Sequence, residues 1–121
     1  MSKRILVVED EEDNRRIVRD LLTSVGYEII EALTGEEGVK AAETYLPDLI
    51  LMDIQLPDLN GYEATRRIKA NPALRKVPII VVTSYALSGD DVKAFEAGCD
   101  GYVTKPFSPR ALLAKIREYL P

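Results

Sequence analysis

Five short apolar runs alternate with segments of helical periodicity along the chain, and this alternation restricts the fold more than any other feature. The runs comprise residues 5–8, 29–32, 49–52, 79–82 and 101–104. Each has the length of a buried strand and is far shorter than a membrane span. Strict alternation of strand and helix implies right-handed crossovers and a parallel sheet covered on both faces. We therefore expect an α/β, doubly wound fold with five strands and five helices.

Apolar spacing and capping residues predict the helices. The first helical segment has apolar residues at a spacing of four with two more beside them, namely Ile17, Leu21, Val25, Val18 and Leu22, and Gly26 ends it. Its outward face is expected to carry Arg15, Arg16, Arg19 and Asp20. Later helices are expected near residues 34–45, 61–70 and 88–97. The last helix should begin at Pro109 with Ser108 as its N-cap, and should place Leu112, Leu113, Ile116 and Leu120 on one face.

The composition predicts one domain and excludes several functional classes. The chain has 121 residues, enough for a single core, so residues 1–121 are expected to form one domain. The net charge is −4 and the basic residues are scattered among acids, which argues against a nucleic-acid-binding surface. The N-terminal apolar run has the wrong length for a signal peptide and is followed by acids. We expect a soluble cytoplasmic protein that does not bind membranes.

Cysteine and histidine usage limits the chemistry further. Cys99 is the only cysteine, so an internal disulfide and a cysteine-based metal site are excluded, and Cys99 should be a small buried residue. The chain contains no histidine, which removes histidine-assisted nucleophiles and histidine-bound metals. Any metal must therefore be a hard cation that prefers oxygen ligands.

Polar residues stand where four of the apolar runs end. The run 49–52 is followed by Asp53, and the run 5–8 is followed by Glu9 and Asp10. The two last runs end in hydroxyl and basic side chains, namely Thr83 with Ser84 and Thr104 with Lys105. Ligands of open α/β sheets bind outside the C-terminal ends of the strands, at the point where the strand order reverses. If the order is 2-1-3-4-5, that point lies between the first and third strands, and Glu9, Asp10 and Asp53 share one crevice.

Three carboxylates that converge in one crevice need a counterion. Their repulsion is about 1 kcal/mol per pair in water and larger at a lower effective dielectric. Mg²⁺ suits such a site because it typically binds one or two carboxylates, waters and a phosphate of the substrate. Asp53 could then attack phosphorus as a nucleophile, while Lys105 and the Thr83 hydroxyl contact the phosphoryl oxygens.

These motifs resemble those of the response regulator receiver domains of two-component signalling. The matching tracts follow the family order and spacing over the whole chain: Val7-Val8-Glu9-Asp10, residues 52–57 with Gly61, Val82-Thr83-Ser84, and Thr104-Lys105-Pro106. The resemblance implies a flavodoxin-like sheet with the strand order 2-1-3-4-5. The tract around Asp53 and the Gly89-Asp90 pair look most like single-domain regulators of the DivK type or receivers fused to hybrid kinases.

The family pattern implies a role for each matching residue. It makes Asp53 the phosphoacceptor, with Thr83 and Lys105 in contact with the phosphoryl group. It assigns the Mg²⁺ ligands to the side chains of Glu9, Asp10 and Asp53 and to the backbone carbonyl of Gln55. The peptide bond between Lys105 and Pro106 would be cis, which directs Lys105 toward the site.

The resemblance also implies residues for switching and for tuning. The Thr83 hydroxyl would move toward the phosphate and Tyr102 would turn inward, which remodels a protein-binding face. Gln55 and Tyr85 lie where the family tunes the access of water to the phosphoryl group, and a bulky Tyr85 would slow dephosphorylation. Tyr102 could instead serve only in packing, and the Thr83 hydroxyl could serve only to hydrogen-bond a carbonyl at the end of the strand. Glu9 and Asp10 could also merely lead into the next helix, whose caps would be Asp13 or Asn14.

Three other functions fit the sequence less well than a receiver does. A magnesium phosphatase of the haloacid dehalogenase type needs an acid two residues after the nucleophile, where this chain has Gln55, and also a cap insertion. A phosphorylation-independent interaction module is less consistent with the complete set of acids, threonine and lysine. A flavodoxin-like electron carrier needs a phosphate-cradling loop after the first strand, where residues 9–13 are acidic.

We therefore expect a stand-alone receiver that catalyses only its own phosphorylation and dephosphorylation. Its phosphoryl donor would be a histidine kinase or a histidine phosphotransfer protein, which would dock along the first helix near Asn14, Arg15 and Val18. No effector domain is expected, so the output would be binding of a downstream protein. The chain should be a monomer or a weak dimer without contact to nucleic acid.

Overall fold

Five strands and five helices alternate in the computed structural model, which describes residues 2–83, 90–105 and 107–121. The strands are β1 (Arg4–Val8), β2 (Glu28–Ala32), β3 (Leu49–Asp53), β4 (Ile79–Thr83) and β5 (Gly101–Thr104). The helices are α1 (Glu12–Ser24), α2 (Gly35–Tyr45), α3 (Gly61–Ala70), α4 (Asp90–Glu96) and α5 (Pro109–Tyr119). Each apolar run of the sequence analysis is therefore a strand, and the α/β alternation is confirmed.

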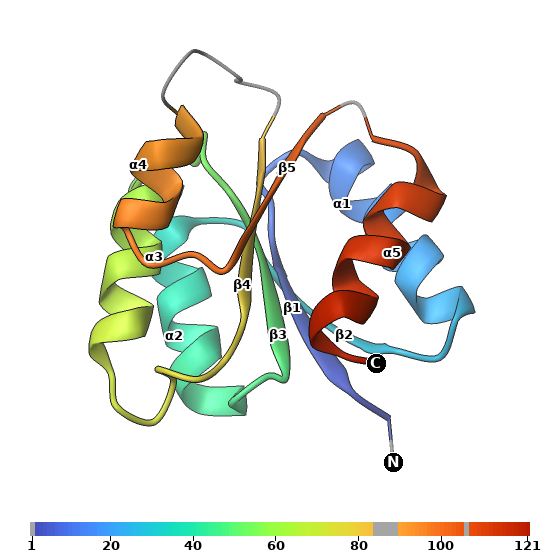
Figure 1. Cartoon of the computed structure of the whole chain (residues 1–121), viewed down its shortest axis with the longest axis horizontal. Coiled ribbons are helices and arrows are strands. Elements are labelled where there is room, and N and C mark those ends of the chain that lie inside the picture. The colour runs from blue at the N-terminus through green and yellow to red at the C-terminus, as the bar shows by residue number, and fades with distance from the viewer. Residues whose placement is uncertain (1, 84–89, 106) are drawn as a thin grey trace.

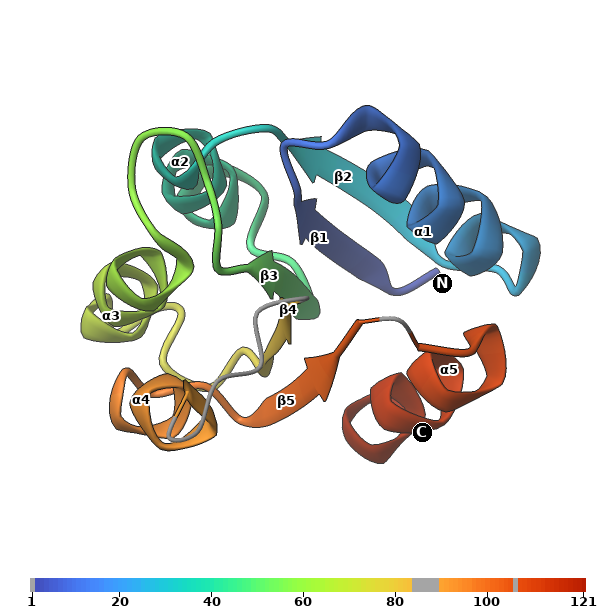
Figure 2. The same cartoon turned by 90° about the horizontal axis from the view of Figure 1, so that it is seen from above.

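The strands form one parallel sheet in the order β2-β1-β3-β4-β5, which confirms the expected topology. Val8 of β1 lies opposite Met52 of β3, and Asp53 lies opposite Val82 of β4. The strand order reverses between β1 and β3, as the view along the strands in Figure 2 shows. This register brings the residues that follow β1 next to the end of β3, at the place where open α/β sheets bind ligands.

Helices cover both faces of the sheet (Figures 1 and 2), and each face has its own apolar core. Helices α1 and α5 lie on one face, and α2, α3 and α4 lie on the other. Alternate strand residues serve the two cores: Ile5 and Val7 pack with α1 and α5, whereas Leu6 and Val8 pack on the opposite face. The continuous apolar runs are explained by this burial on both faces.

Side-chain caps explain where three helices begin. Thr34, Asn60 and Ser108 precede α2, α3 and α5, and each side chain accepts a hydrogen bond from the backbone N–H three residues later, at 3.0 to 3.1 Å. The predicted start of the last helix at Pro109 is confirmed. The predicted caps of the first helix are wrong, because α1 begins at Glu12 and already contains Asp13 and Asn14.

The predicted faces of the first helix are only partly correct. Val18 and Leu22 are buried, but Ile17 and Val25 are 57% and 41% exposed. Residues four apart advance by about 40° around a helix, so a row at that spacing winds away from the core. Arg15 was expected to face outward, yet its side chain is only 14% exposed.

Two remaining expectations concern the later part of the chain. Cys99 is buried, as expected, and burial raises the pKa of its thiol to about 11. The fourth helix was expected to start at Ser88, which lies outside the described residues, and its described part begins at Asp90 and ends before Gly98. None of the helices in the described parts of the chain is both long and apolar enough to cross a membrane.

Candidate functional site

Three carboxylates converge where β1 and β3 end. Asp53 is the last residue of β3, and Glu9 and Asp10 follow β1 directly. One carboxylate oxygen from each of the three residues lies within 4.8 Å of the others. Glu9 and Asp53 are 6% and 8% exposed, while Asp10 is exposed to solvent. The parallel register of neighbouring strands therefore places two buried acids and one exposed acid in a single cluster.

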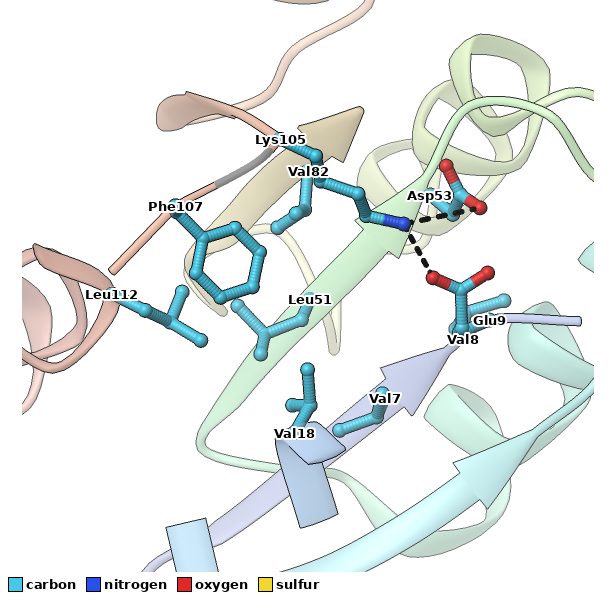
Figure 3. A pocket seen from close by; sticks show the side chains of 10 residues that line it. All are labelled: Val7, Val8, Glu9, Val18, Leu51, Asp53, Val82, Lys105, Phe107 and Leu112. Atoms are coloured by element: carbon cyan, nitrogen blue, oxygen red, sulfur yellow. Dashed lines mark hydrogen bonds and ion pairs between the residues drawn. The ribbon is translucent and has the colours of Figure 1, made fainter. Parts of the chain in front are cut away.

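Lys105 reaches this acidic cluster from the end of β5. Its Nζ lies 2.6 Å from Glu9 Oε1 and 3.9 Å from Asp53 Oδ2, as the dashed lines in Figure 3 show. The Lys105 backbone N–H also donates a hydrogen bond of 2.7 Å to the carbonyl of Thr83. This bond links the end of β5 to the end of β4 and helps to direct the lysine across the ends of the strands.

The buried acids hold their protons unequally. Burial, together with the hydrogen bond and negative charge of Glu9, raises the pKa of Asp53 to about 7, although Lys105 and the Ile54 N–H act in the opposite direction. Burial also works to raise the pKa of Glu9, but hydrogen bonds from Asp53 and Lys105 outweigh it and lower that pKa below its ordinary value. Without a cation, the two acids thus share a proton that resides mainly on Asp53.

The acidic cluster fits Mg²⁺ by the chemistry of its donors. It offers hard oxygen ligands from Glu9, Asp10 and Asp53, which is the donor set that Mg²⁺ prefers. The Ile54 backbone N–H donates a 2.8 Å hydrogen bond to Asp53 Oδ1 and so fixes the orientation of that carboxylate. A divalent cation would balance the buried negative charge and displace the shared proton.

The other predicted site residues are distributed around the acidic cluster. Thr83 is fully buried at the end of β4 and lies opposite Thr104 of β5. Gln55 is exposed in the loop two residues beyond Asp53. Tyr102 is half-buried and packs against the core on the α2–α4 side. Three residues of the predicted site lie outside the described residues, namely Ser84, Tyr85 and Pro106.

A small cavity lies beside Lys105 on the α1–α5 side of the sheet (Figure 3). Its volume is about 20 Å³, which is enough for about one water molecule. Glu9, Asp53 and Lys105 form part of its wall, and apolar side chains form the rest, namely Val7, Val8, Val18, Leu51, Val82, Phe107 and Leu112. Asp53 thus lies in the wall of a mostly apolar cavity, and burial is the largest cause of its raised pKa.

The β3–α3 loop is fixed by contacts that the sequence analysis missed. Gly61 approaches the strand end so closely that a Cβ atom there would lie 2.1 Å from the Asp53 carbonyl oxygen. Its N–H donates a hydrogen bond of 2.9 Å to the Ile54 carbonyl. Asp58 accepts hydrogen bonds from the first two backbone N–H groups of α2, those of Gly35 at 2.9 Å and Glu36 at 3.1 Å. The loop after Asp53 is therefore tied to a neighbouring helix.

Arg15 is a second residue that the sequence analysis misplaced. Its guanidinium contacts the backbone carbonyl of Glu9 and the side chain of Glu31 instead of solvent. A basic residue near the N-terminus of a helix is disfavoured by the helix dipole, and this unusual position was the available signal. Val18, which was expected near the docking surface, is 9% exposed and packs in the core beneath α1.

Comparisons with known proteins agree with this geometry. The family model of the response regulator receiver domain matches residues 5–117. The chain belongs to this family. It is 42% identical over 120 residues to the polar-differentiation response regulator DivK of Brucella ovis, and the match covers 99% of this chain and 98% of the relative. It is thus a DivK-like receiver domain of a two-component response regulator.

Solved receiver structures share the fold over nearly the whole chain. The receiver domain of the sensor histidine kinase PA1611 from Pseudomonas aeruginosa PAO1 is 38% identical, with a TM-score of 0.92 and coverage of 99% of this chain and 98% of that one. That structure holds a magnesium ion in its active-site cleft. A CheY-like receiver from Methanospirillum hungatei JF-1 is also 38% identical, with a TM-score of 0.91 and coverage of 99% and 94%.

Proposed function

We propose that this receiver accepts a phosphoryl group on Asp53 from a phosphohistidine of a partner protein, in a reaction that depends on Mg²⁺. The observation that carries the proposal is the arrangement of Asp53. Its buried carboxylate lies among Glu9, Asp10 and Lys105, so two acids can hold a cation and one lysine can hold an anion beside the same oxygen atoms. Residues 1–121 act as a single domain in this proposal.

Each residue of the site has a distinct part in the reaction. Glu9, Asp10, Asp53 and the backbone carbonyl of Gln55 would hold Mg²⁺, which supplies positive charge to the phosphoryl oxygens when it is bound. Lys105 stands 3.9 Å from Asp53 Oδ2 and can move from Glu9 toward an incoming phosphoryl oxygen. Thr83 at the end of β4 donates its hydroxyl to another phosphoryl oxygen. Lys105 and Thr83 thus bind the negatively charged phosphoryl oxygens, which are absent from the site before the transfer.

The transfer conserves atoms and charge without a further reactant. A carboxylate oxygen of Asp53 attacks phosphorus, the bond from phosphorus to the histidine nitrogen breaks, and that nitrogen takes the bonding electron pair. A phosphohistidine that is protonated on its other ring nitrogen thereby leaves as neutral imidazole. Hydrolysis of the acyl phosphate by water returns the Asp53 carboxylate and inorganic phosphate. The protein changes only its own covalent state in this cycle and turns over no separate substrate.

Phosphorylation would be read as a change in packing. Thr83 and Tyr102 lie on the neighbouring strands β4 and β5, so movement of the hydroxyl toward the phosphate can be followed by the aromatic ring. The resulting change alters the surface near α4, β5 and α5 and thereby the affinity for a downstream protein. The donor would be a histidine kinase or a histidine phosphotransfer protein, since the chain itself has no histidine.

A mass measurement tests the acceptor and the metal together. The full chain is incubated with acetyl phosphate in Mg²⁺ or EDTA, and its intact mass is recorded for wild type, Asp53→Asn and Asp48→Asn. Asp48 is the matched control because it precedes the opposite end of β3 and accepts a hydrogen bond from the Arg4 N–H. We expect one phosphoryl group on wild type and Asp48→Asn in Mg²⁺, and none on Asp53→Asn.

Other results would favour the rival functions. An adduct that persists in Asp53→Asn would place the acceptor elsewhere. Absence of both an adduct and Mg²⁺ binding in the wild type would favour a phosphorylation-independent interaction module. Continuous phosphate release from added phosphomonoesters would favour a phosphatase. The sequence argues against this class, because the chain has Gln55 where the class needs an acid.

A further inference from the structure

We propose that Arg15 is a positioning residue for the metal site, and that it holds the β1–α1 turn so that Glu9 and Asp10 converge on Asp53. This inference rests on the Mg²⁺ site of the proposed function and adds a residue of α1 to its construction. Arg15 contacts no phosphoryl group or cation in this account. It acts through the backbone of the two residues whose side chains are the candidate ligands.

The guanidinium of Arg15 contacts the backbone of Glu9 and of Asp10. Arg15 Nη1 donates a hydrogen bond of 3.2 Å to the Glu9 carbonyl oxygen and lies 3.5 Å from the Asp10 carbonyl oxygen. Its Nε donates a bond of 3.0 Å to Glu31 Oε1 on β2. The planar guanidinium can serve these acceptors from one orientation, which a lysine ammonium on a flexible stem cannot reproduce.

The position of the turn explains why such a brace matters. The Glu9 N–H still pairs with the Ala32 carbonyl of β2 at 3.0 Å, so Glu9 marks the end of the sheet ladder on this side. The chain then leaves the sheet and enters α1 at Glu12. Glu9 and Asp10 therefore lie in the turn itself, and the backbone conformation of this turn sets the orientation of both carboxylates. A donor that bonds to their backbone carbonyls fixes that orientation.

Charge favours the same arrangement. Residues 9–13 are all acidic, and Arg15 places a poorly exposed positive charge beside the start of this run. Glu31 on β2 pairs with the Arg15 guanidinium and also lies 3.5 Å from Arg19 Nη1, so two ion pairs join α1 to β2. Arg16 differs in this respect, since it is exposed and pairs only at 3.3 Å with the exposed Asp13 among the contacts that the structure describes.

A purely structural role predicts a different pattern. If Arg15 only joins α1 to β2, its removal lowers stability equally with and without Mg²⁺, and the affinity for Mg²⁺ stays the same. If it positions the turn, its removal weakens Mg²⁺ binding in a protein that is still folded. Residues that orient metal ligands typically change metal affinity by about 10- to 100-fold when they are replaced.

The test is a Mg²⁺ titration of the full chain, followed by amide NMR shifts at constant ionic strength. The variants are Arg15→Met, which removes the charge at similar length, and Arg15→Lys, which keeps the charge without the fork. Arg16→Met is the matched control one residue further along α1. We expect Arg15→Met to bind Mg²⁺ about tenfold more weakly, Arg15→Lys to lie between it and wild type, and Arg16→Met to change by about twofold or less.

A second readout separates positioning from chemistry. The rate of phosphorylation by acetyl phosphate is measured against the Mg²⁺ concentration for the same variants. Positioning predicts that Arg15→Met needs more Mg²⁺ for half of the maximal rate, while the rate at saturating Mg²⁺ stays near that of wild type. If Arg15→Met does not fold in EDTA, Glu31→Gln replaces it, because this variant leaves Arg15 in place and removes the negative charge of its partner on β2.

The outcomes distinguish the two proposals. Equal Mg²⁺ affinity of wild type and of the Arg15 variants, or equal weakening by Arg15→Met and Arg16→Met, would overturn the role of Arg15 and leave the metal site intact. The role of Arg15 would also be overturned if Arg15→Met were phosphorylated more slowly than wild type at saturating Mg²⁺ but reached half of its maximal rate at the same Mg²⁺ concentration. A wild-type protein that binds no Mg²⁺ would overturn the metal site of the proposed function and the inference with it.

Discussion

The β1–α1 loop and the β3–α3 loop both carry candidate metal ligands, yet different forces hold them. The β1–α1 loop is held by the guanidinium of Arg15, which bonds to the Glu9 carbonyl and to Glu31. The β3–α3 loop is held by close backbone packing at Gly61 and by the hydrogen bonds of Asp58 to the start of α2. The β1–α1 loop is thus held mainly by charge, whereas the β3–α3 loop is held by close packing at Gly61 with the hydrogen bonds of Asp58 in addition.

The two kinds of fixation predict different responses to substitution. Steric fixation fails abruptly when a side chain is added, because backbone atoms in a packed interior have no room to move. Electrostatic fixation fails gradually, because partly exposed charges are screened by salt and each pair contributes little. We therefore expect the β3–α3 loop to respond strongly to glycine replacement and the β1–α1 loop to respond weakly to loss of charge.

The largest effect is expected from Gly61→Ala. The new Cβ would lie 2.1 Å from the Asp53 carbonyl oxygen, so the backbone must shift at the site itself. The free energy of unfolding, measured with urea, should fall by about 3 kcal/mol. Gly26→Ala is the control, since Gly26 has a φ of +98° but no atom within 4 Å of an added Cβ, and it should cost about 1 kcal/mol. Equal losses of stability for the two variants would show that close packing at Gly61 does not hold the β3–α3 loop.

The next effect concerns the point where the two loops bring their acids together. Asp53 has a pKa of about 7 in the folded protein, above its ordinary value of 3.8, so the folded state keeps a proton that the unfolded state releases. The stability linked to this proton is present below pH 3.8 and is lost as the pH rises through 7. Asp53→Asn cannot ionise, and it should therefore be more stable than wild type at high pH.

Urea unfolding in EDTA measures this effect. At pH 8 the advantage of Asp53→Asn should be about 2 kcal/mol, because the lowered pKa of Glu9 offsets part of the Asp53 shift. At pH 5 the difference in stability between Asp53→Asn and wild type should be much smaller. At pH 8 saturating Mg²⁺ should stabilise the wild type and so abolish the difference. A difference that does not change between the two pH values would show that repulsion between the acids is not its cause.

A smaller loss is expected from Gly35→Ala at the other side of the β3–α3 loop. An added Cβ would lie 2.6 Å from the Leu59 carbonyl oxygen and 2.7 Å from the Leu59 Cβ. Because Leu59 belongs to the loop, it can shift, and alanine also favours the helix more than glycine does. We expect a net loss of about 1 kcal/mol in urea unfolding. A gain in stability would show that this loop is softer than its contacts indicate.

The smallest effect is expected from Glu31→Gln in the β1–α1 brace. The Arg15 and Glu31 side chains are 14% and 30% exposed, so their ion pair is partly screened. The variant should lose about 0.5 kcal/mol at low salt and less at high salt. Asp13→Asn is the control, because its pair with Arg16 is exposed and should change stability hardly at all. A loss from Glu31→Gln that is large and independent of salt would mean that shape also holds this loop.

The sequence predicted the strands and the acidic cluster for simple physical reasons. Runs such as residues 49–52 are apolar at every position, and their short length and their alternation with helical segments indicate strands buried on both faces. In a parallel sheet the C-terminal ends of neighbouring strands lie at one edge, so Glu9, Asp10 and Asp53 could be expected to meet once the strand order was known. The order itself was expected from the family resemblance and not from the apolar pattern.

The sequence did not reveal how the two loops are held. The guanidinium of Arg15 reaches Glu31, which is 16 residues away, and Asp58 reaches Gly35, which is 23 residues away. Periodicity describes neighbours along one element, so it carries no signal for such contacts between elements. The start of α1 was misplaced for a related reason, because Glu11 precedes that helix without a side-chain cap bond.

Local chemistry along the chain determined the elements of this protein, their order of alternation and the oxygen-rich character of its site. These properties depend on the period of apolar residues, on capping side chains and on the absence of histidine, all of which are local. Only the tertiary structure decided the 3.9 Å approach of Lys105 to Asp53, the raised pKa of Asp53 and the bracing role of Arg15. Burial and distance set these properties, because electrostatic energy depends on the separation of charges in space and on the solvent between them.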